Sequence, residues 1–316
     1  MPFSRRLSFA GLWCAAGIVT AAISLAAFGA RLWWPLDLAS SFRAQYFVAL
    51  VVLGAGAALL RRRRSALAIA AVALLNLLPL LPLFTGGGTA GADGPVHRAV
   101  CMNVHVFNRH RADVLAWLRD ADADLIVLLE TSDRWLAALA PLRASHPHVV
   151  AEPRSDAFGI AVFSRYALVD ARVVSLGPAM VPSVFGTVQL AGQEITLLAT
   201  HPVPPWGGRL AAMRDEQIDR ICSLIAGAPR PLLLLGDLNT TPFAPSFEKL
   251  LDATGLRDSA AGFGYQPTWP AWCPPLAIPL DHCLHSTDID IVDRRTGPAL
   301  GSDHRPLLVD FRVRTP

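Results

Sequence analysis

The chain has 316 residues, 53% of them hydrophobic and only 17% charged, which is too apolar for an ordinary soluble protein but leaves room for an α/β domain beside membrane segments. Eight of the 28 basic side chains and one of the 25 acidic side chains lie within residues 1–85. Residues 86–316 therefore hold 20 basic and 24 acidic side chains, and this balance argues against the basic surface of a typical nucleic-acid-binding domain.

Three apolar runs near the N-terminus predict transmembrane helices, at about residues 8–30, 44–60 and 66–84. A cleaved signal peptide is an alternative for the first run, but its apolar stretch is longer than such peptides usually have. The second run is short for a span, and it ends at four arginines, Arg61 to Arg64, that cannot follow it into lipid. The third contains Asn76, which we interpret as a contact between packed helices.

The arginines near these runs predict an orientation. Arg5 and Arg6 precede the first run, and Arg61 to Arg64 separate the second from the third, so these arginines are expected in the cytoplasm. Three spans then place everything after residue 85 outside. The expectation is an integral protein of a bacterial inner membrane, with its N-terminal helices in lipid and an extracytoplasmic C-terminal domain. If the second run is only re-entrant, the domain is instead cytoplasmic.

Residues 86–97, with their glycine-rich start, predict a flexible linker, and residues 98–316 predict an α/β domain in which β-rich runs alternate with helical patterns. Four leucines at residues 232–235, between a proline and a glycine, predict a central strand, after which Gly236 is expected to let the chain turn. Ala191 and Gly192 predict a hairpin turn. The other strands are expected at residues 99–102, 125–129, 159–163, 184–190, 195–199 and 307–311, and helices at 112–119 and 213–225.

Polar side chains recur where these strands end. They are Asn103, Glu130, His201, Asp237, Asn239 and Asp281 after an apolar run, and Ser302, Asp303 and His304 before the last strand. Their convergence on one edge predicts a site, although Asp237 and Asn239 taken alone equally fit an Asx turn. Several carboxylates in one crevice need a cation. Because the candidate ligands are oxygens and no cysteines are paired, that cation is expected to be Mg²⁺ or Mn²⁺ rather than zinc.

Six motifs, MNVH, DLIVLLE, ATHP, GDLNTTP, PLDH and GSDHRP, occur in this order between about residues 98 and 313. Together they resemble the motif series of the endonuclease/exonuclease/phosphatase (DNase I-like) superfamily of metal-dependent phosphodiesterases, and six ordered motifs are far more specific than any one of them. The resemblance implies a four-layered α/β sandwich, in which two mixed β-sheets pack face to face with helices outside. His105 stands where many members have an acid, so the number of metal ions is left open.

The resemblance also implies roles for these residues. Asn103, Glu130 and Asp303 match metal ligands, with Glu130 the principal one. Asp237 matches the carboxylate that positions or deprotonates the attacking water, and Asn239 matches the amide that holds the phosphate.

His201 and His304 match the pair that stabilises the pentacovalent phosphorane, and Asp281 matches the residue that orients His304. This set implies a membrane-tethered, Mg²⁺-dependent (or Mn²⁺-dependent) phosphohydrolase that cleaves a phosphodiester or phosphomonoester by in-line attack of water. The substrate is left open between nucleic acid, a phospholipid such as sphingomyelin, and a small phosphoester. A catalytically silent membrane-bound binding module is the alternative, which the intact motifs disfavour. The sequence identifies no oligomeric state.

Residues 262–279 are rich in aromatic side chains and proline, and they predict either a stiff connection packed on Trp269 and Trp272 or a wall of the substrate cleft, with Trp206 on the facing wall. Cys273 and Cys283 are close enough in sequence for a disulfide, but separate thiols fit as well. The histidines without a motif role are interpreted as solvated: His97, His110, His146, His148, His282 and His285.

Overall fold

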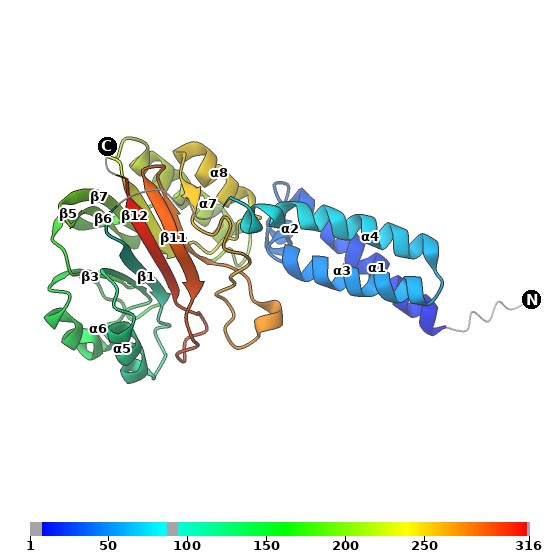
Figure 1. The fold of residues 1–316 in the computed structure, drawn as a ribbon, viewed down its shortest axis with the longest axis horizontal. Helices are drawn as coiled ribbons and strands as arrows, with labels where there is room; N and C mark the ends of the chain where they lie inside the picture. The colour runs from blue at the N-terminus through cyan, green and yellow to red at the C-terminus, as the bar shows by residue number, and fades with distance from the viewer. Residues whose placement is uncertain (1–7, 87–93, 315–316) are drawn as a thin grey trace, which may run out of the picture. The chain divides into compact units, whose positions relative to one another are not determined.

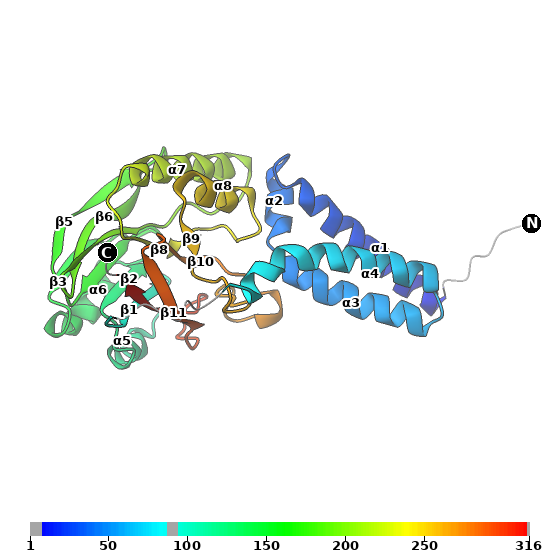
Figure 2. The same cartoon turned by 45° about the horizontal axis from the view of Figure 1, so that its top comes forward.

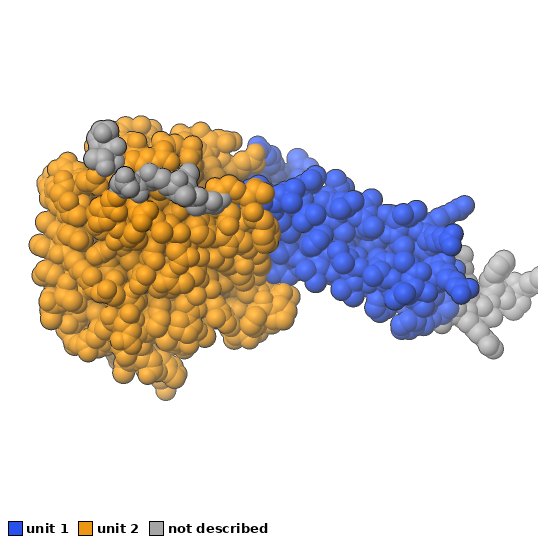
Figure 3. Space-filling view, viewed as in Figure 1, with its two compact units in different colours: residues 1–82, 243–245 blue, residues 83–242, 246–316 orange. Residues whose placement is uncertain are grey.

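The chain divides into two units (Figure 3). The first comprises residues 1–82 with 243–245 and is mostly helical, and the second comprises residues 83–242 with 246–316. The computed structural model describes residues 8–86 and 94–314, so most of the predicted linker lies outside the described residues. The N-terminal helices are α1 (Phe9–Ala26), η1 (Ala27–Gly29), α2 (Trp34–Ser40), α3 (Arg43–Leu59), α4 (Arg63–Leu77) and η2 (Leu78–Phe84).

Two helical segments are long and apolar enough to cross a membrane. They are Phe9–Gly29, formed by α1 and η1, and Arg63–Phe84, formed by α4 and η2. The predicted second span is α3, which follows α2 with a bend of 66°, so that this pair is one broken span or a re-entrant loop. The first and third predicted spans thus have the required length and hydropathy by themselves. The second has them only together with α2. Arg63 and Arg64 lie in the first turn of α4, not in the loop where they were predicted.

A buried polar cluster links three of these helices. The Nη1 atom of Arg43 donates to the backbone oxygen of Ser24 at 3.1 Å and to Oδ1 of Asn76 at 3.2 Å. The Nδ2 atom of Asn76 donates to Oγ of Ser24 at 3.1 Å. These bonds satisfy polar groups in apolar surroundings, and Asn76 is a packing contact, as predicted.

Two mixed β-sheets of six strands each form the second unit. The first has the order β11-β12-β1-β2-β4-β3, with bounds β1 (His97–Asn103), β2 (Leu125–Leu129), β3 (His148–Glu152), β4 (Ile160–Ser164), β11 (Ile289–Thr296) and β12 (Leu307–Val313). The second has the order β5-β6-β7-β8-β10-β9, with bounds β5 (Leu168–Leu176), β6 (Val181–Leu190), β7 (Gln193–Ala199), β8 (Leu232–Asp237), β9 (Arg257–Asp258) and β10 (Asp281–His285).

The same plan recurs in both sheets, although the sequence shows no internal repeat. A central parallel pair, β1 with β2 or β7 with β8, is joined through a helix, α5 (Arg111–Asp120) or α7 (Gly208–Ala226). Antiparallel strands flank each pair, β12 and β4 in the first sheet and β6 and β10 in the second. Because parallel strands end at the same edge of their sheet, the plan delivers two strand ends per sheet to one edge.

Three clusters of buried side chains order the layers. One lies between the sheets and takes residues from both, the second joins the first sheet to α5 and α6 (Asp133–Leu139), and the third joins the second sheet to α7 and α8 (Pro245–Thr254). Figures 1 and 2 show these two pairs of helices on opposite sides of the sheets. The predicted α/β fold of two mixed sheets flanked by helices is therefore confirmed.

Strand β8 is buried on both faces, as its four leucines predict. Leu233 and Leu235 pack between the sheets, whereas Leu232 and Leu234 pack under the helices. The expectation that Gly236 makes a turn is wrong, since Gly236 lies inside β8. It must be glycine for another reason: a Cβ atom there would lie 1.9 Å from the backbone oxygen of Thr200.

A fork of hydrogen bonds joins β1 to β12. The Nε and Nη2 atoms of Arg98 donate to Oδ1 and Oδ2 of Asp310 at 2.6 and 2.9 Å. Burial opposes the charge of this carboxyl, but the hydrogen bonds from Arg98 outweigh burial and lower the pKa of Asp310. Such a group stabilises the fold above its unfolded-state pKa of about 4, and that stabilisation is lost as the pH falls through its folded-state pKa.

We predict that Asp310→Asn lowers the free energy of unfolding of the purified chain by about 2 kcal/mol at neutral pH. The difference from the wild type should shrink as the pH falls below the unfolded-state pKa of about 4, and it should vanish below the folded-state pKa, where the wild-type carboxyl is protonated too. Urea unfolding in detergent at a series of pH values measures this. Asp252→Asn, the same change at an exposed position of α8, is the control. A difference that grows at low pH would contradict the assignment.

Candidate active site

The candidate site lies at the edge where β1, β2, β7 and β8 end. Asn103 is the last residue of β1 and Asp237 the last of β8, while Glu130 and His201 follow β2 and β7 within two residues. Asp281 is at the start of β10, not at the end of a strand as predicted. It still reaches the same edge, because β10 runs antiparallel to β8 and pairs Asp281 with Asp237.

Asn103 and Glu130 form the part of the site on the first sheet. The Nδ2 atom of Asn103 donates to Oε1 of Glu130 at 2.9 Å and to Oδ2 of Asp237 at 3.3 Å. The Oδ1 atom of Asn103 accepts from the backbone N–H of His105 at 3.0 Å. In this orientation Asn103 connects the two carboxylates, and its Oδ1 atom keeps a second lone pair beside the bond from His105.

Glu130 is left with free coordinating capacity. Its Oε2 atom accepts from the backbone N–H of Val106 at 3.1 Å, and its backbone has a φ of 59°, a conformation uncommon for a residue other than glycine. The side chain is half-buried. Two hydrogen bonds hold the carboxylate of Glu130 at the strand end, and such a fixed side chain is suited to be a metal ligand.

Asp237 and Asn239 form the turn that the sequence left as an alternative, and they do so inside the site. The Oδ1 atom of Asp237 accepts from the backbone N–H of Asn239 at 3.0 Å, which is an Asx turn. Asn239 has a φ of 48°, and its Nδ2 atom donates to the backbone oxygen of Pro202 at 2.8 Å. The turn thus leaves Oδ2 of Asp237 for the other site residues.

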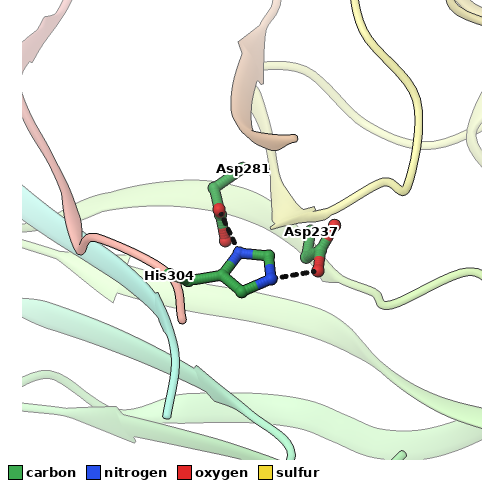
Figure 4. A group of neighbouring side chains, drawn as sticks. All are labelled: Asp237, Asp281 and His304. Carbon is green, nitrogen blue, oxygen red and sulfur yellow. Dashed lines mark hydrogen bonds and ion pairs between the residues drawn. The ribbon is translucent and has the colours of Figure 1, made fainter. Parts of the chain in front are cut away.

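His304 lies between two carboxylates (Figure 4). Its Nδ1 atom is 2.8 Å from Oδ2 of Asp281, and its Nε2 atom is 3.5 Å from Oδ2 of Asp237. Among the described residues these three make a group whose ligating atoms all lie within 4.8 Å of one another. The imidazole therefore joins both carboxylates, through a hydrogen bond to Asp281 and an ion pair with Asp237, while the buried Oδ1 atom of Asp281 has no hydrogen-bond partner among the described residues. This group contains none of the predicted ligands Asn103, Glu130 and Asp303.

The charges in this group stabilise one another. Burial opposes a charge on His304, but the carboxylates of Asp281 and Asp237 outweigh it and raise the pKa of His304 to about 10. Burial also opposes the charge of Asp237, but His304 and His201 lower its pKa well below the usual range. His201, whose Nε2 atom is 3.4 Å from Oδ2 of Asp237, likewise has a raised pKa despite burial, because of Asp237. The imidazole of His304 is therefore a cation at neutral pH, and the charged form of His201 is favoured in the same sense.

Asp303 enters the site from the loop before β12. The indole Nε1 of Trp269 donates to its Oδ2 atom at 3.0 Å, whereas its buried Oδ1 atom has no hydrogen-bond partner among the described residues. The neighbouring Ser302 fixes the loop, since its Oγ atom donates to the backbone oxygen of Asn103 at 2.7 Å and accepts from the N–H of His304 at 3.0 Å.

Hydrogen bonds or ion pairs connect seven of the eight predicted site residues. The eighth, Asp303, is linked to them as the residue before His304 in the sequence. Sequence reasoning missed two supporting residues, Trp269 behind Asp303 and Thr268, whose Oγ1 atom accepts from the N–H of Asp281 at 3.2 Å. Their only signal was the aromatic loop. The loop is not packed on both tryptophans as one alternative predicted, because Trp269 is half-buried but 76% of the surface of Trp272 is exposed. The other alternative, a wall of the substrate cleft, stays a prediction.

Four histidines interpreted as solvated are buried: His97, His146, His282 and His285. His282 is wholly buried, with its Nε2 atom 2.9 Å from the backbone oxygen of Thr240 and its ring against that of Phe247. The prediction failed because a backbone carbonyl can replace water as the hydrogen-bond partner of a neutral imidazole. Burial favours this neutral form and lowers the pKa of His282. Only His110 and His148 are exposed as expected. Cys273 and Cys283 are both free thiols.

A family model places this geometry among known proteins. The model described as endonuclease/exonuclease/phosphatase family matches residues 101–304, which include all eight site residues. The chain belongs to the endonuclease/exonuclease/phosphatase family. Among curated proteins, none matches the chain.

Solved structures agree with this family at the level of the fold. An endonuclease/exonuclease/phosphatase from Beutenbergia cavernae is 20% identical, with a TM-score of 0.57 over 70% of this chain and 72% of that one. The human Nocturnin catalytic domain is 17% identical, with a TM-score of 0.55 over 71% and 96%. Sphingomyelinase C from Streptomyces griseocarneus is 16% identical, with a TM-score of 0.51 over 69% and 99%.

We predict that Asp281 acts through His304 in this family member. Asp281→Asn and His304→Ala should each lower phosphodiesterase turnover by at least about 100-fold, because each removes the oriented imidazolium. The double variant should be little worse than the worse single one. Steady-state kinetics of the four proteins measures this cycle, with His148→Ala, at an exposed position of β3, as the control. Full additivity of the two losses would count against the pairing.

Proposed function

We propose that this family member is a divalent-metal-dependent phosphohydrolase that cleaves a phosphodiester or phosphomonoester by in-line attack of water. The observation that carries the proposal is the chain Asp281–His304–Asp237 beside Glu130, all at one edge of the two sheets. A phosphate ester requires charge neutralisation, an oriented water and stabilisation of the leaving oxygen, and these residues offer a group for each task.

The residues fit a metal ion. Glu130, Asp237, Asp281 and Asp303 bring four carboxylates to one edge against two imidazoles, and the Oδ1 atoms of Asp281 and Asp303 are buried without a hydrogen-bond partner among the described residues. Asn103, Glu130 and Asp303 are the proposed ligands, and Mg²⁺ (or Mn²⁺) is the proposed ion because hard oxygen donors favour it. When bound, the ion would neutralise the phosphate and polarise its phosphorus–oxygen bonds.

The protein groups would act as follows. Asp237 accepts a hydrogen bond from water and aims it at phosphorus, and its lowered pKa suits it to orienting water more than to keeping a proton. The water oxygen bonds to phosphorus as the bond to the leaving oxygen breaks, and the proton lost by water ends on that oxygen. His201 and His304 stabilise the negative charge that develops, and Asn239 holds a phosphate oxygen through its amide.

The first prediction from this mechanism concerns the metal. Glu130→Gln keeps the size of the side chain but removes its charge, so we expect hydrolysis to fall by orders of magnitude while the fold survives. Mg²⁺ should raise the melting temperature of the wild-type chain much more than that of the variant, because the ion binds the folded state.

A panel of plasmid DNA, short RNA, sphingomyelin and inositol phosphates serves for the activity arm, with and without EDTA. Glu152→Gln, at an exposed position of β3, is the control for loss of a glutamate charge. Equal rates of hydrolysis in EDTA and in Mg²⁺ would refute the metal assignment. Mg²⁺ stabilisation without hydrolysis of any compound would favour the silent binding module.

The N-terminal helices support a second part of the proposal, that residues 1–85 tether a hydrolase domain of residues 98–316 to a membrane through the linker 86–97. Large apolar side chains of α1, α3 and α4 are exposed to the surroundings, among them Phe9, Ile18, Val52 and Leu74. Exposed surface of this kind on long helices is suited to lipid and not to water. The proposed location is the inner membrane of a bacterium, with the hydrolase domain outside.

We predict that a C-terminal alkaline phosphatase fusion is active and a C-terminal GFP fusion is dark, because the arginines before α1 and around the start of α4 are expected inside. The result depends on the bent pair α2 and α3. If this pair crosses the membrane once, the number of spans is odd and the domain is outside. A fluorescent GFP fusion with a silent phosphatase would show that the pair is re-entrant and that the domain is cytoplasmic.

A further inference from the structure

Three exposed aromatic side chains lie on three different loops of the edge that carries the candidate active site. Phe107 follows β1, Trp206 follows β7 and Trp272 precedes β10, and they are 76%, 73% and 76% exposed. We refer to these three as the aromatic rim. Single exposed apolar residues are common on proteins, but large aromatic side chains on three loops around one site mark an interaction surface.

Hydrogen bonds fix two of the rim loops directly to site residues. The residue before Phe107 donates its backbone N–H to Oε2 of Glu130 at 3.1 Å. The residue before Trp272 donates its backbone N–H to the backbone oxygen of Asp303 at 2.7 Å. Anything that contacts these two aromatic side chains is therefore held close to the proposed metal ligands.

The other side of the rim is tied to the site in the same way. Trp206 lies in the loop at residues 202–208, whose first carbonyl accepts from Nδ2 of Asn239 at 2.8 Å. The next turn along this edge, between β5 and β6, ends in Met180, which is 62% exposed and adds apolar surface. The exposed apolar side chains thus continue across the second sheet.

Two of the three rim loops are uncharged, and this favours one kind of partner over another. Residues 202–208 and residues 260–280 contain no Asp, Glu, Lys or Arg, whereas the loop of Phe107 contains Arg109. A nucleic acid gains most of its affinity from many Lys and Arg contacts to its phosphates, and the two tryptophan loops supply none. Tryptophan on an uncharged, proline-rich loop instead suits the interface of a bilayer, where the ring is buried beside headgroups and its N–H stays hydrated.

The length of the connection keeps the second unit near a bilayer. Residues 85–96 separate η2 from β1, and a chain of this length spans at most about 45 Å when fully extended. If the N-terminal helices lie in lipid, the second unit cannot move farther from the surface than this. A lipid interface is thus the apolar partner present at the highest local concentration.

We propose that the aromatic rim docks on the bilayer that anchors the chain, and that the substrate is a phosphoester carried by a lipid headgroup. This inference rests on the membrane tether and the hydrolase activity proposed above. Docking would present the headgroup phosphate to the site while the acyl chains stay in the bilayer. Hydrolysis would then join the water oxygen to phosphorus and break one ester bond, so that the lipid part stays behind and the other product leaves into water.

The docking half of the proposal is tested with the full-length chain in vesicles of phosphatidylcholine brominated on its acyl chains. Bromine quenches tryptophan fluorescence only at close range. Because other tryptophans lie in the N-terminal helices, the signal of interest is the difference between the wild type and Trp206→Phe/Trp272→Phe. We expect bromination to lower this difference by at least about twofold. An equal difference in brominated and ordinary vesicles would overturn docking, and this measurement needs no turnover.

The substrate half is tested by hydrolysis in vesicles of phosphatidylcholine, phosphatidylglycerol and sphingomyelin, beside the soluble diester bis(4-nitrophenyl) phosphate. For Phe107→Ser/Trp206→Ser/Trp272→Ser we expect the loss on vesicle lipid to exceed the loss on the soluble diester by at least about tenfold. Val169→Ser/Val292→Ser, two exposed apolar positions on β5 and β11, is the matched control and should change neither rate.

The other outcomes overturn the inference in distinguishable ways. Equal losses on both substrates would mean that the rim supports the reacting groups and not a lipid surface. A selective loss on short single-stranded RNA would mean that bases stack on the rim. Wild-type hydrolysis of the soluble diester but of no vesicle lipid would refute the substrate class alone. No hydrolysis of any compound, with bromine quenching intact, would refute the proposed function and leave docking standing.

Discussion

One oxygen atom holds the candidate active site together. Oδ2 of Asp237 lies 3.3 Å from Nδ2 of Asn103, 3.4 Å from Nε2 of His201 and 3.5 Å from Nε2 of His304. A carboxylate that is 1% exposed keeps its charge only when donors and cations replace the water it has lost. These partners come from both sheets. The close packing of β1 against β8 is therefore an electrostatic requirement of the site as well as a consequence of the apolar core.

Much of this arrangement could be predicted from the sequence, because one pattern, an apolar run that ends in a polar residue, marks both a buried strand and a residue of the site. Leu125–Leu129 is an unbroken apolar strand whose end is marked by Glu130, and the leucines of β8 end in the same way at Asp237. Where burial on both faces requires an apolar run, the first polar residue after it lies at the sheet edge. Strand ends and candidate site residues thus followed from one pattern.

The buried polar strand β10 could not be predicted, because its residues are stabilised by partners far away in the sequence. Strand β10 reads DHCLH, with two histidines and an aspartate, yet every residue in it is buried, since Asp281 bonds to His304 and His282 to the backbone of Thr240. Strand β5 was missed for the opposite reason: most of its residues are only partly buried or exposed, so it has no apolar run. Neither local propensity nor periodicity records such partners.

The division of the site between two sheets makes hydrolysis sensitive to how those sheets are aligned. Asn103, Glu130 and His304 belong to the first sheet and its connections, and His201, Asp237 and Asp281 to the second. No backbone hydrogen-bond ladder joins the two sheets in the described part of the chain, so side chains set their register, both apolar ones such as Val127 and Leu235 and the polar contacts of the site. A sliding of one sheet by a fraction of a side-chain width would separate the imidazole of His304 from its two carboxylates while leaving every strand intact. Catalysis should consequently respond to small volume changes in the inter-sheet core long before the secondary structure does, which makes activity the more sensitive gauge of packing in this fold.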